Sequence, residues 1–168
     1  MDVVVVVLRI VHIVSGVLWV GGAAVFFLYA QPTIAKLGPD AEKFVDEMVN
    51  RRRLPVYFLT ASTLTVLAGV VMYWRQFGGI NTSPVGLGFG LGGLAAIIAW
   101  LGGNILIPKT FETLATLAAE VRTSAGPPAV EVVARMQATQ QQLRLIGMIV
   151  LALLGFAVVA MASARYLR

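Results

Sequence analysis

The stretch RIVHIVSGVLWVGG, residues 9–22, lies inside a long apolar run and contains the one histidine of the chain. The run extends from residue 3 to residue 30, and a helix of that length can cross a hydrocarbon core of about 30 Å with some tilt. Charged and ionisable side chains are costly inside such a helix. Arg9 and His12 therefore indicate a functional site on a membrane helix.

The composition of the whole chain is typical of an integral membrane protein. Of its 168 residues, 58% are hydrophobic and 12% are charged, whereas soluble domains carry about 25% charged residues. The formal net charge of +5 does not predict nucleic-acid binding, because the basic residues lie between apolar runs and form no stripe with aromatic residues. Cysteine is absent, which excludes disulfides and thiolate metal sites.

The apolar runs predict an all-α membrane protein, a four-transmembrane-helix bundle in a single domain. The predicted spans cover residues 3–30, 54–74, 84–107 and 143–164. We expect Pro32 and Pro108 to end the first and third spans. The first run has no basic segment before it and no cleavage site after it, so we expect a retained helix and not a signal peptide.

Two polar connections, 31–53 and 108–142, are predicted to be amphipathic and to lie on one side of the membrane. The first contains a short helix that starts near Gly38 and presents an apolar face to the membrane surface. The second contains two short helices broken at 124–128, where serine, glycine and two prolines occur.

The basic residues predict the orientation of the bundle. The two connections contain Lys36, Lys43, Arg51, Arg52, Arg53, Lys109, Arg122 and Arg135, with Arg144 at the edge of the second. The other side has only Arg75, Arg165 and Arg168 outside the spans. The positive-inside rule therefore places both connections in the cytoplasm and both termini outside.

A short motif suggests an internal duplication. Trp19-x-Gly21-Gly22 recurs as Trp100-x-Gly102-Gly103, and each copy precedes a proline, an amphipathic connection and another span. Two hairpins in the same orientation would form a parallel repeat. Chance recurrence in a chain so rich in glycine is the alternative.

The candidate cofactor site is one face of the first helix. His12, Trp19 and small residues between them recur at spacings of three and four, so they share that face. An imidazole, close backbone approach and aromatic walls suit a flat cofactor in a helix bundle. Counting inward from the same side brings Gly92, Gly93 and Gly155 to a similar depth, while Gly69 lies nearer the outside. The predicted cofactor-binding residues are His12, Arg9, Trp19, Gly92, Gly93 and Gly155.

His12 and Arg9 also have structural interpretations. His12 could bond to Ser15 or to a threonine of the second span and only hold the bundle together. Arg9 could extend outward to lipid phosphates, or it could pair with a haem propionate. If His12 binds haem iron, the candidates for a second ligand are Met72, Met161 or His12 of a second copy. With one histidine and no acidic residue in the spans, a zinc site, a catalytic triad and a proton relay are not predicted.

A family resemblance is carried by Arg9-x-x-His12-Ile13 followed by Trp19-x-Gly21-Gly22. This pattern resembles the first helix of the copper-resistance D-like superfamily of bacterial membrane proteins, which includes the haem-containing protoporphyrinogen IX oxidases. The segments RRRLP at 51–55 and LTVLAG at 64–69 are also similar. The resemblance implies that His12 is a haem ligand and that the protein lies in the bacterial inner membrane. The oxidases also use a lysine in a later helix, and the third span here contains none.

These observations lead us to expect a membrane b-type haem protein that serves electron transfer or haem handling, with His12 as axial ligand. Its surroundings would be the lipid bilayer, and its partner a second copy or another membrane subunit. One alternative is a cofactor-free structural or accessory protein whose glycine-rich third span packs on a partner subunit. Another is a small-solute or metal-tolerance permease component.

Overall fold

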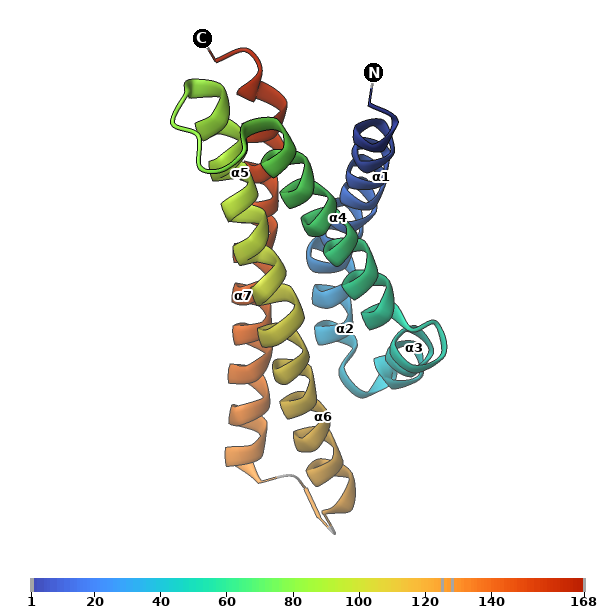
Figure 1. The fold of residues 1–168 in the computed structure, drawn as a ribbon. Helices are drawn as coiled ribbons and strands as arrows, with labels where there is room; N and C mark the ends of the chain where they lie inside the picture. Colours follow the sequence, from blue (N-terminus) through green and yellow to red (C-terminus); the bar gives the residue numbers. More distant parts are fainter. Residues whose placement is uncertain (1, 125, 128, 168) are drawn as a thin grey trace.

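Every regular element in the computed structural model is a helix, within the residues that it describes, 2–124, 126–127 and 129–167 (Figure 1). In chain order the elements are α1 (Val3–Val25), η1 (Phe26–Ala30), α2 (Gln31–Leu37), η2 (Gly38–Ala41), α3 (Glu42–Asp46), η3 (Glu47–Arg51), α4 (Leu54–Phe77), α5 (Pro84–Leu101), η4 (Gly102–Leu106), α6 (Ile107–Thr123) and α7 (Val130–Ala164). Four continuous helices are long and apolar enough to cross a membrane, namely Val3–Leu37, Leu54–Phe77, Pro84–Thr123 and Val130–Ala164. The predicted all-α class with four candidate spans is confirmed.

The four long helices form two hairpins that pack against each other. Helix α1 packs mainly on α4, and α5 packs mainly on α7. Helix α4 also contacts α5, and α1 contacts α7 along a shorter stretch. The start of α1 and the end of α7 lie at the same end of the bundle (Figure 1). The side of the membrane at which they lie remains a prediction, and Arg168, which was counted for it, lies outside the described residues.

We had expected the first and third spans to end at the two prolines, but both helices continue past them. Proline lacks the N–H group that would bond to the preceding turn of an α-helix. In both places a π-helical turn precedes it: the Gln31 N–H bonds to Phe26 O, and the Ile107 N–H bonds to Gly102 O. This wider turn shifts the hydrogen-bond ladder by one residue, so the helix continues past the proline as α2 and as α6.

The second connection extends the spans instead of forming two separate helices. Helix α6 follows η4 without a break, and α7 is a single helix of 35 residues that includes the fourth span. The predicted break at 124–128 does fall between α6 and α7, although Ala125 and Pro128 lie outside the described residues. The first connection contains the short helix α3 as predicted, and Arg122 of α6 forms an ion pair with Glu42 of α3.

In both halves of the chain a π-helical turn precedes a proline, but the W-x-G-G motif lies at a different distance from that turn in each half. Trp19 lies seven residues before η1, whereas Trp100 lies two residues before η4. Trp19 is buried in the core, while Trp100 is half-buried and donates from Nε1 to Thr63 Oγ1 at 3.1 Å. The two tryptophans therefore occupy different positions in their helices.

The core lies where the two hairpins meet. Its buried members come from all four long helices and η1: Trp19, Ala23, Phe27, Ala61, Ala99, Val150 and Leu154. Small residues let helix backbones approach closely in a membrane. At Gly147 of α7 a Cβ atom would overlap the ring of Phe27, so the missing side chain makes room for that ring.

Candidate functional site

His12 lies on the side of α1 that faces α4, and its imidazole is half-buried. Its Nδ1 atom is 2.8 Å from the backbone oxygen of Thr65. A carbonyl oxygen can only accept, so Nδ1 carries the proton and Nε2 of the neutral ring has a free lone pair. Nε2 has no hydrogen-bond partner among the described residues, and it is not one of their fully buried unpaired atoms. In the neutral tautomer, the nitrogen that a metal would use therefore has a lone pair that no described residue occupies.

Gly69 of α4 makes room for the imidazole. A Cβ atom at this position would lie 2.9 Å from Cε1 and 3.1 Å from Nδ1 of His12. Thr65 is four residues before Gly69, so its carbonyl is the one that accepts the Gly69 N–H in the helix. Without a side chain at Gly69, this carbonyl is open to a second donor from α1. We call this arrangement a ring-on-glycine contact.

Tyr57 makes the same ring-on-glycine contact in the opposite direction. Its hydroxyl, on α4, donates to Leu18 O of α1 at 2.7 Å. Gly22, four residues after Leu18, lies beneath the ring, where a Cβ atom would be 3.1 Å from both Cε1 and the hydroxyl oxygen. Helices α1 and α4 are thus joined by two reciprocal bonds from a side chain to the main chain.

Tyr73 makes a third ring-on-glycine contact, from α4 to α5. Its hydroxyl donates to Gly86 O at 3.3 Å, and a Cβ atom at Gly90 would lie 3.3 Å from that hydroxyl. The acceptor is again four residues before the glycine. A histidine is therefore one of three ring donors used in the same way.

Hydroxyl groups beside His12 form a small polar cluster between α1 and α4. Thr65 Oγ1 lies 2.9 Å from Ser15 Oγ and 2.7 Å from Ala61 O. Ser15 donates in turn to Val11 O at 2.6 Å. The predicted structural partner of His12, a threonine of the second span, is therefore present, but His12 uses its carbonyl and not its hydroxyl.

The three glycines predicted at the depth of His12 lie elsewhere in the packing. A Cβ atom at Gly92 would lie 2.9 Å from Met161 Cγ and 3.2 Å from Ala157 O, so Gly92 serves the contact between α5 and α7. Around Gly93 and Gly155 the described structure has no atom within 4 Å of such a Cβ. The structure brings Gly69 to the histidine ring, and Trp19 to the core.

The other predicted site residues have separate surroundings. Arg9 is exposed and forms no ion pair within the described part of the chain. Met161 packs at Gly92, as described above, while Met72 is half-buried and lies three residues beyond Gly69 on α4. Of the two methionines, Met72 is thus the one on the helix that contacts His12.

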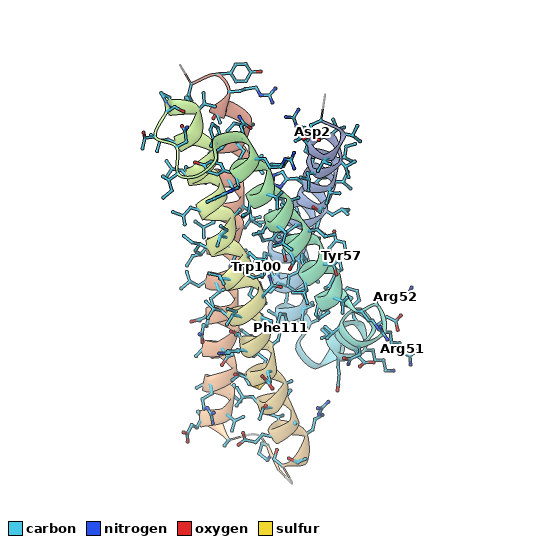
Figure 2. All side chains as sticks on the ribbon, viewed as in Figure 1. Asp2, Arg51, Arg52, Tyr57, Trp100 and Phe111 are labelled. Atoms are coloured by element: carbon cyan, nitrogen blue, oxygen red, sulfur yellow. The ribbon has the colours of Figure 1, made fainter. Side chains whose placement is uncertain are left out.

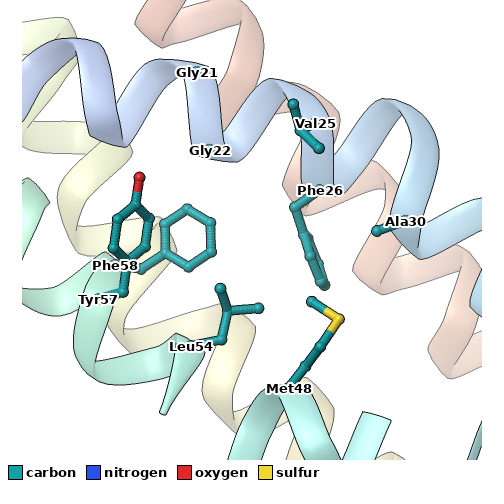
Figure 3. Close-up of a pocket in the computed structure, with 9 residues that line it drawn as sticks. All are labelled: Gly21, Gly22, Val25, Phe26, Ala30, Met48, Leu54, Tyr57 and Phe58. Atoms are coloured by element: carbon teal, nitrogen blue, oxygen red, sulfur yellow. The ribbon is translucent and has the colours of Figure 1, made fainter. Parts of the chain in front are cut away.

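Two hollows lie along the α1–α4 hairpin. The first, of about 300 Å³, is lined by residues of α1, η1, η3 and α4 (Figure 3). The second, of about 540 Å³, is lined by α1 residues from Ile10 to Leu18 and α4 residues from Val56 to Leu64. Neither is lined by His12, and neither lies between the hairpins. Polar side chains of α4 bond to α5 and η4: Trp100 of α5 donates to Thr63, and Asn104 of η4 donates to Ser62 Oγ at 3.2 Å.

Sequence reasoning missed Tyr57, Tyr73 and the role of Gly69. The pattern of a glycine four residues after an exposed carbonyl is too common to identify a contact unless the facing helix is known. Within the described residues no three of His, Cys, Asp and Glu come together as metal ligands. A single imidazole suits a metal that arrives with ligands of its own, as in haem.

Comparison of the chain with protein-family models, curated proteins and solved structures finds no match.

Proposed function

We propose that this protein is a multi-pass protein of the bacterial inner membrane and binds haem b through Nε2 of His12. The observation that supports this most directly is the bond from His12 Nδ1 to the Thr65 carbonyl. A histidine that ligates a metal usually donates its other ring N–H to such an acceptor, which sets the tautomer and the orientation of the ring. The resemblance of the first helix to haem-containing bacterial membrane proteins agrees with this proposal.

The residues around His12 fit a haem ligand in their donor chemistry. The macrocycle supplies four nitrogen ligands, so the protein needs to supply one or two. His12 would hold the iron, Thr65 would orient the imidazole and Gly69 would leave space for it. Arg9, one turn before His12, would offer its charge to a propionate, and Met72, Met161 or His12 of a second copy would complete the ligand set. When bound, haem supplies one-electron chemistry.

The membrane placement is supported by the four candidate spans and by the basic residues of the two connections. We propose both termini outside and both connections in the cytoplasm, following the positive-inside rule. The recurrence of a π-helical turn before Pro32 and Pro108 supports an arrangement of two parallel-repeated hairpins.

An absorption spectrum of the full chain tests the haem proposal. The protein is produced with added haem precursor, purified in detergent, and measured in its oxidised and reduced forms. We expect a Soret band in the wild type and its loss in His12→Ala. Tyr57→Phe is the matched control, because it removes the hydrogen bond of a ring-on-glycine contact that contains no metal ligand. A wild type without a Soret band, or a band that His12→Ala leaves unchanged, would overturn the proposal.

A second candidate is a cofactor-free structural or accessory membrane protein. The observation that favours it is that Tyr57 and Tyr73 make the same contact as His12. On this interpretation His12 is only a hydrogen-bond donor between helices, and the protein binds no haem. His12→Gln, which retains an N–H donor, should then preserve the stability of the protein. The spectrum of the wild type separates the two candidates.

A further inference from the structure

An apolar hollow of about 300 Å³ lies at the η3–α4 corner, between these two elements and the α1–η1 helix. Gly21 and Gly22 form part of its wall on α1, and Phe26, Met48 and Leu54 converge on it from three elements (Figure 3). The rings of Tyr57 and Phe58 occupy the space at Gly22. At Gly21, in contrast, a Cβ atom would meet nothing within 4 Å in the described structure. The hollow is large enough to be compared with small ligand sites, which start at about 300 Å³.

Three consecutive arginines lie at the edge of this hollow. Met48 of η3 and Leu54 of α4 both line it, and Arg51, Arg52 and Arg53 connect these two elements. All three arginines are exposed, and Figure 2 shows Arg51 and Arg52 extending away from the bundle.

The charges of these arginines are not balanced locally. Glu47 is shared between Arg51 Nε at 3.6 Å and Arg52 Nε at 3.0 Å. Asp46 accepts a bond from Asn50, and Arg53 has no ion pair within the described residues. Arg51 and Arg52 thus share one carboxylate and Arg53 pairs with none in the described structure, so this segment carries excess positive charge that can attract an anion.

We propose that this corner binds one anionic phospholipid, with an acyl chain in the apolar hollow and its phosphate at Arg51, Arg52 and Arg53. Leu54 begins a candidate span, so the arginines lie where lipid phosphates lie and the hollow lies where acyl chains begin. An acidic peptide would satisfy the arginines but would leave the apolar lining uncovered. The inference rests on the membrane placement proposed above and is independent of haem.

Native mass spectrometry of the detergent-purified full chain tests this site. The probes are phosphatidylglycerol and phosphatidylcholine with identical acyl chains, and inorganic phosphate as a competitor. We expect phosphatidylglycerol to be retained in preference to phosphatidylcholine. Arg52→Gln and Arg53→Gln should each weaken phosphatidylglycerol binding about fivefold, which corresponds to the contribution of about 1 kcal/mol of one basic residue near an anionic surface. Arg165→Gln, at the opposite end of the bundle, is the matched charge control and should change nothing.

Gly21→Leu tests the acyl-chain part of the proposal. Gly21 lines the hollow, and a Cβ atom there would meet no atom within 4 Å in the described structure. We therefore expect this variant to fold and to unfold thermally as the wild type does while losing its lipid. Gly155→Leu is the matched control, because Gly155 also faces open space but does not line the hollow. Equal retention of the two lipids, full displacement by inorganic phosphate, or wild-type lipid binding by Gly21→Leu would each overturn the site. A failure of the membrane placement itself would be recognised separately, because alkaline carbonate would then release the protein from membranes.

Discussion

His12 on α1 donates a hydrogen bond from Nδ1 to the backbone carbonyl of Thr65 on α4, over 2.8 Å. The bond joins a side chain of one candidate span to the main chain of the next, and Gly69 is the residue that permits it. Hydrogen bonds between membrane helices contribute about 0.6 kcal/mol on average and up to about 1.7 kcal/mol. The contribution of this bond to the free energy of unfolding is therefore large enough to measure, whether or not a cofactor binds.

Gly69→Ala should destabilise the wild type by displacing the imidazole, since the new methyl group would lie 2.9 Å from Cε1. We expect a loss of about 1 kcal/mol, close to the value of one interhelical bond. In a His12→Ala background the same substitution should cost nothing, because there is no ring to displace. Thermal unfolding of the four proteins in detergent measures this coupling, and additive effects of the two substitutions would argue against the contact.

Tyr57→Phe should destabilise the protein more than Tyr73→Phe does. Each change removes one hydroxyl donor, but the Tyr57 bond to Leu18 O is 2.7 Å long and the Tyr73 bond to Gly86 O is 3.3 Å. Hydrogen bonds from a hydroxyl to an oxygen usually span about 2.5–3.0 Å, so the Tyr73 bond is long and the Tyr57 bond is not. We expect a loss of up to about 1.7 kcal/mol for Tyr57 and less for Tyr73. Denaturant unfolding in mixed micelles gives the ranking, and the reverse order would contradict the geometry.

Two glycines of α7 should respond to alanine in opposite directions. At Gly147 the added methyl group would overlap the ring of Phe27, and overpacking of a core costs about 1–3 kcal/mol. At Gly155 it would meet open space, and alanine should stabilise the helix by up to about 1 kcal/mol. Because both changes are on the same helix, the difference between their unfolding midpoints isolates the packing of Phe27.

Gln31→Met should stabilise the protein. Gln31 is 5% exposed, and its Oε1 atom is buried without a hydrogen-bond partner in the described structure. An unsatisfied buried acceptor costs about 1–3 kcal/mol, and methionine has a similar shape without that cost. A rise in the unfolding midpoint is the expected result. A fall would show that a bound water or another group satisfies the amide.

Arg53→Gly should relieve backbone strain at the turn before α4. Arg53 has a φ of 52°, and a residue with a Cβ atom pays about 1–2 kcal/mol in this left-handed region, where glycine is free of the penalty. We expect higher thermal stability together with weaker binding of phosphatidylglycerol. Arg53→Gln should lower lipid binding equally without the gain in stability, so the pair separates the charge of this residue from its backbone conformation.

Local properties of the sequence determined the all-α class, the four candidate spans, the short helix α3 and the break between α6 and α7. Length and hydropathy of a run suffice to predict a membrane helix, because in lipid a helix satisfies its own backbone groups. The same local rules were wrong at Pro32 and Pro108. They describe proline in a regular α-helix, and here a π-helical turn shifts the hydrogen bonds one residue before each proline.

The candidate site shows more clearly how far a structure can be predicted from the sequence. The stretch around His12 was enough to identify the histidine as the candidate ligand, because its chemistry is unusual for its position. Its neighbours depended on the tertiary structure: Gly69 lies beneath the ring, while Gly92 packs on α7 and Gly155 faces open space. Counting residues along separate helices ignores their tilt and rotation, and these are set by packing between the helices. The sequence alone therefore singled out His12 as the candidate ligand, and only the tertiary structure decided that a carbonyl of α4 orients its ring and that a glycine makes room for it.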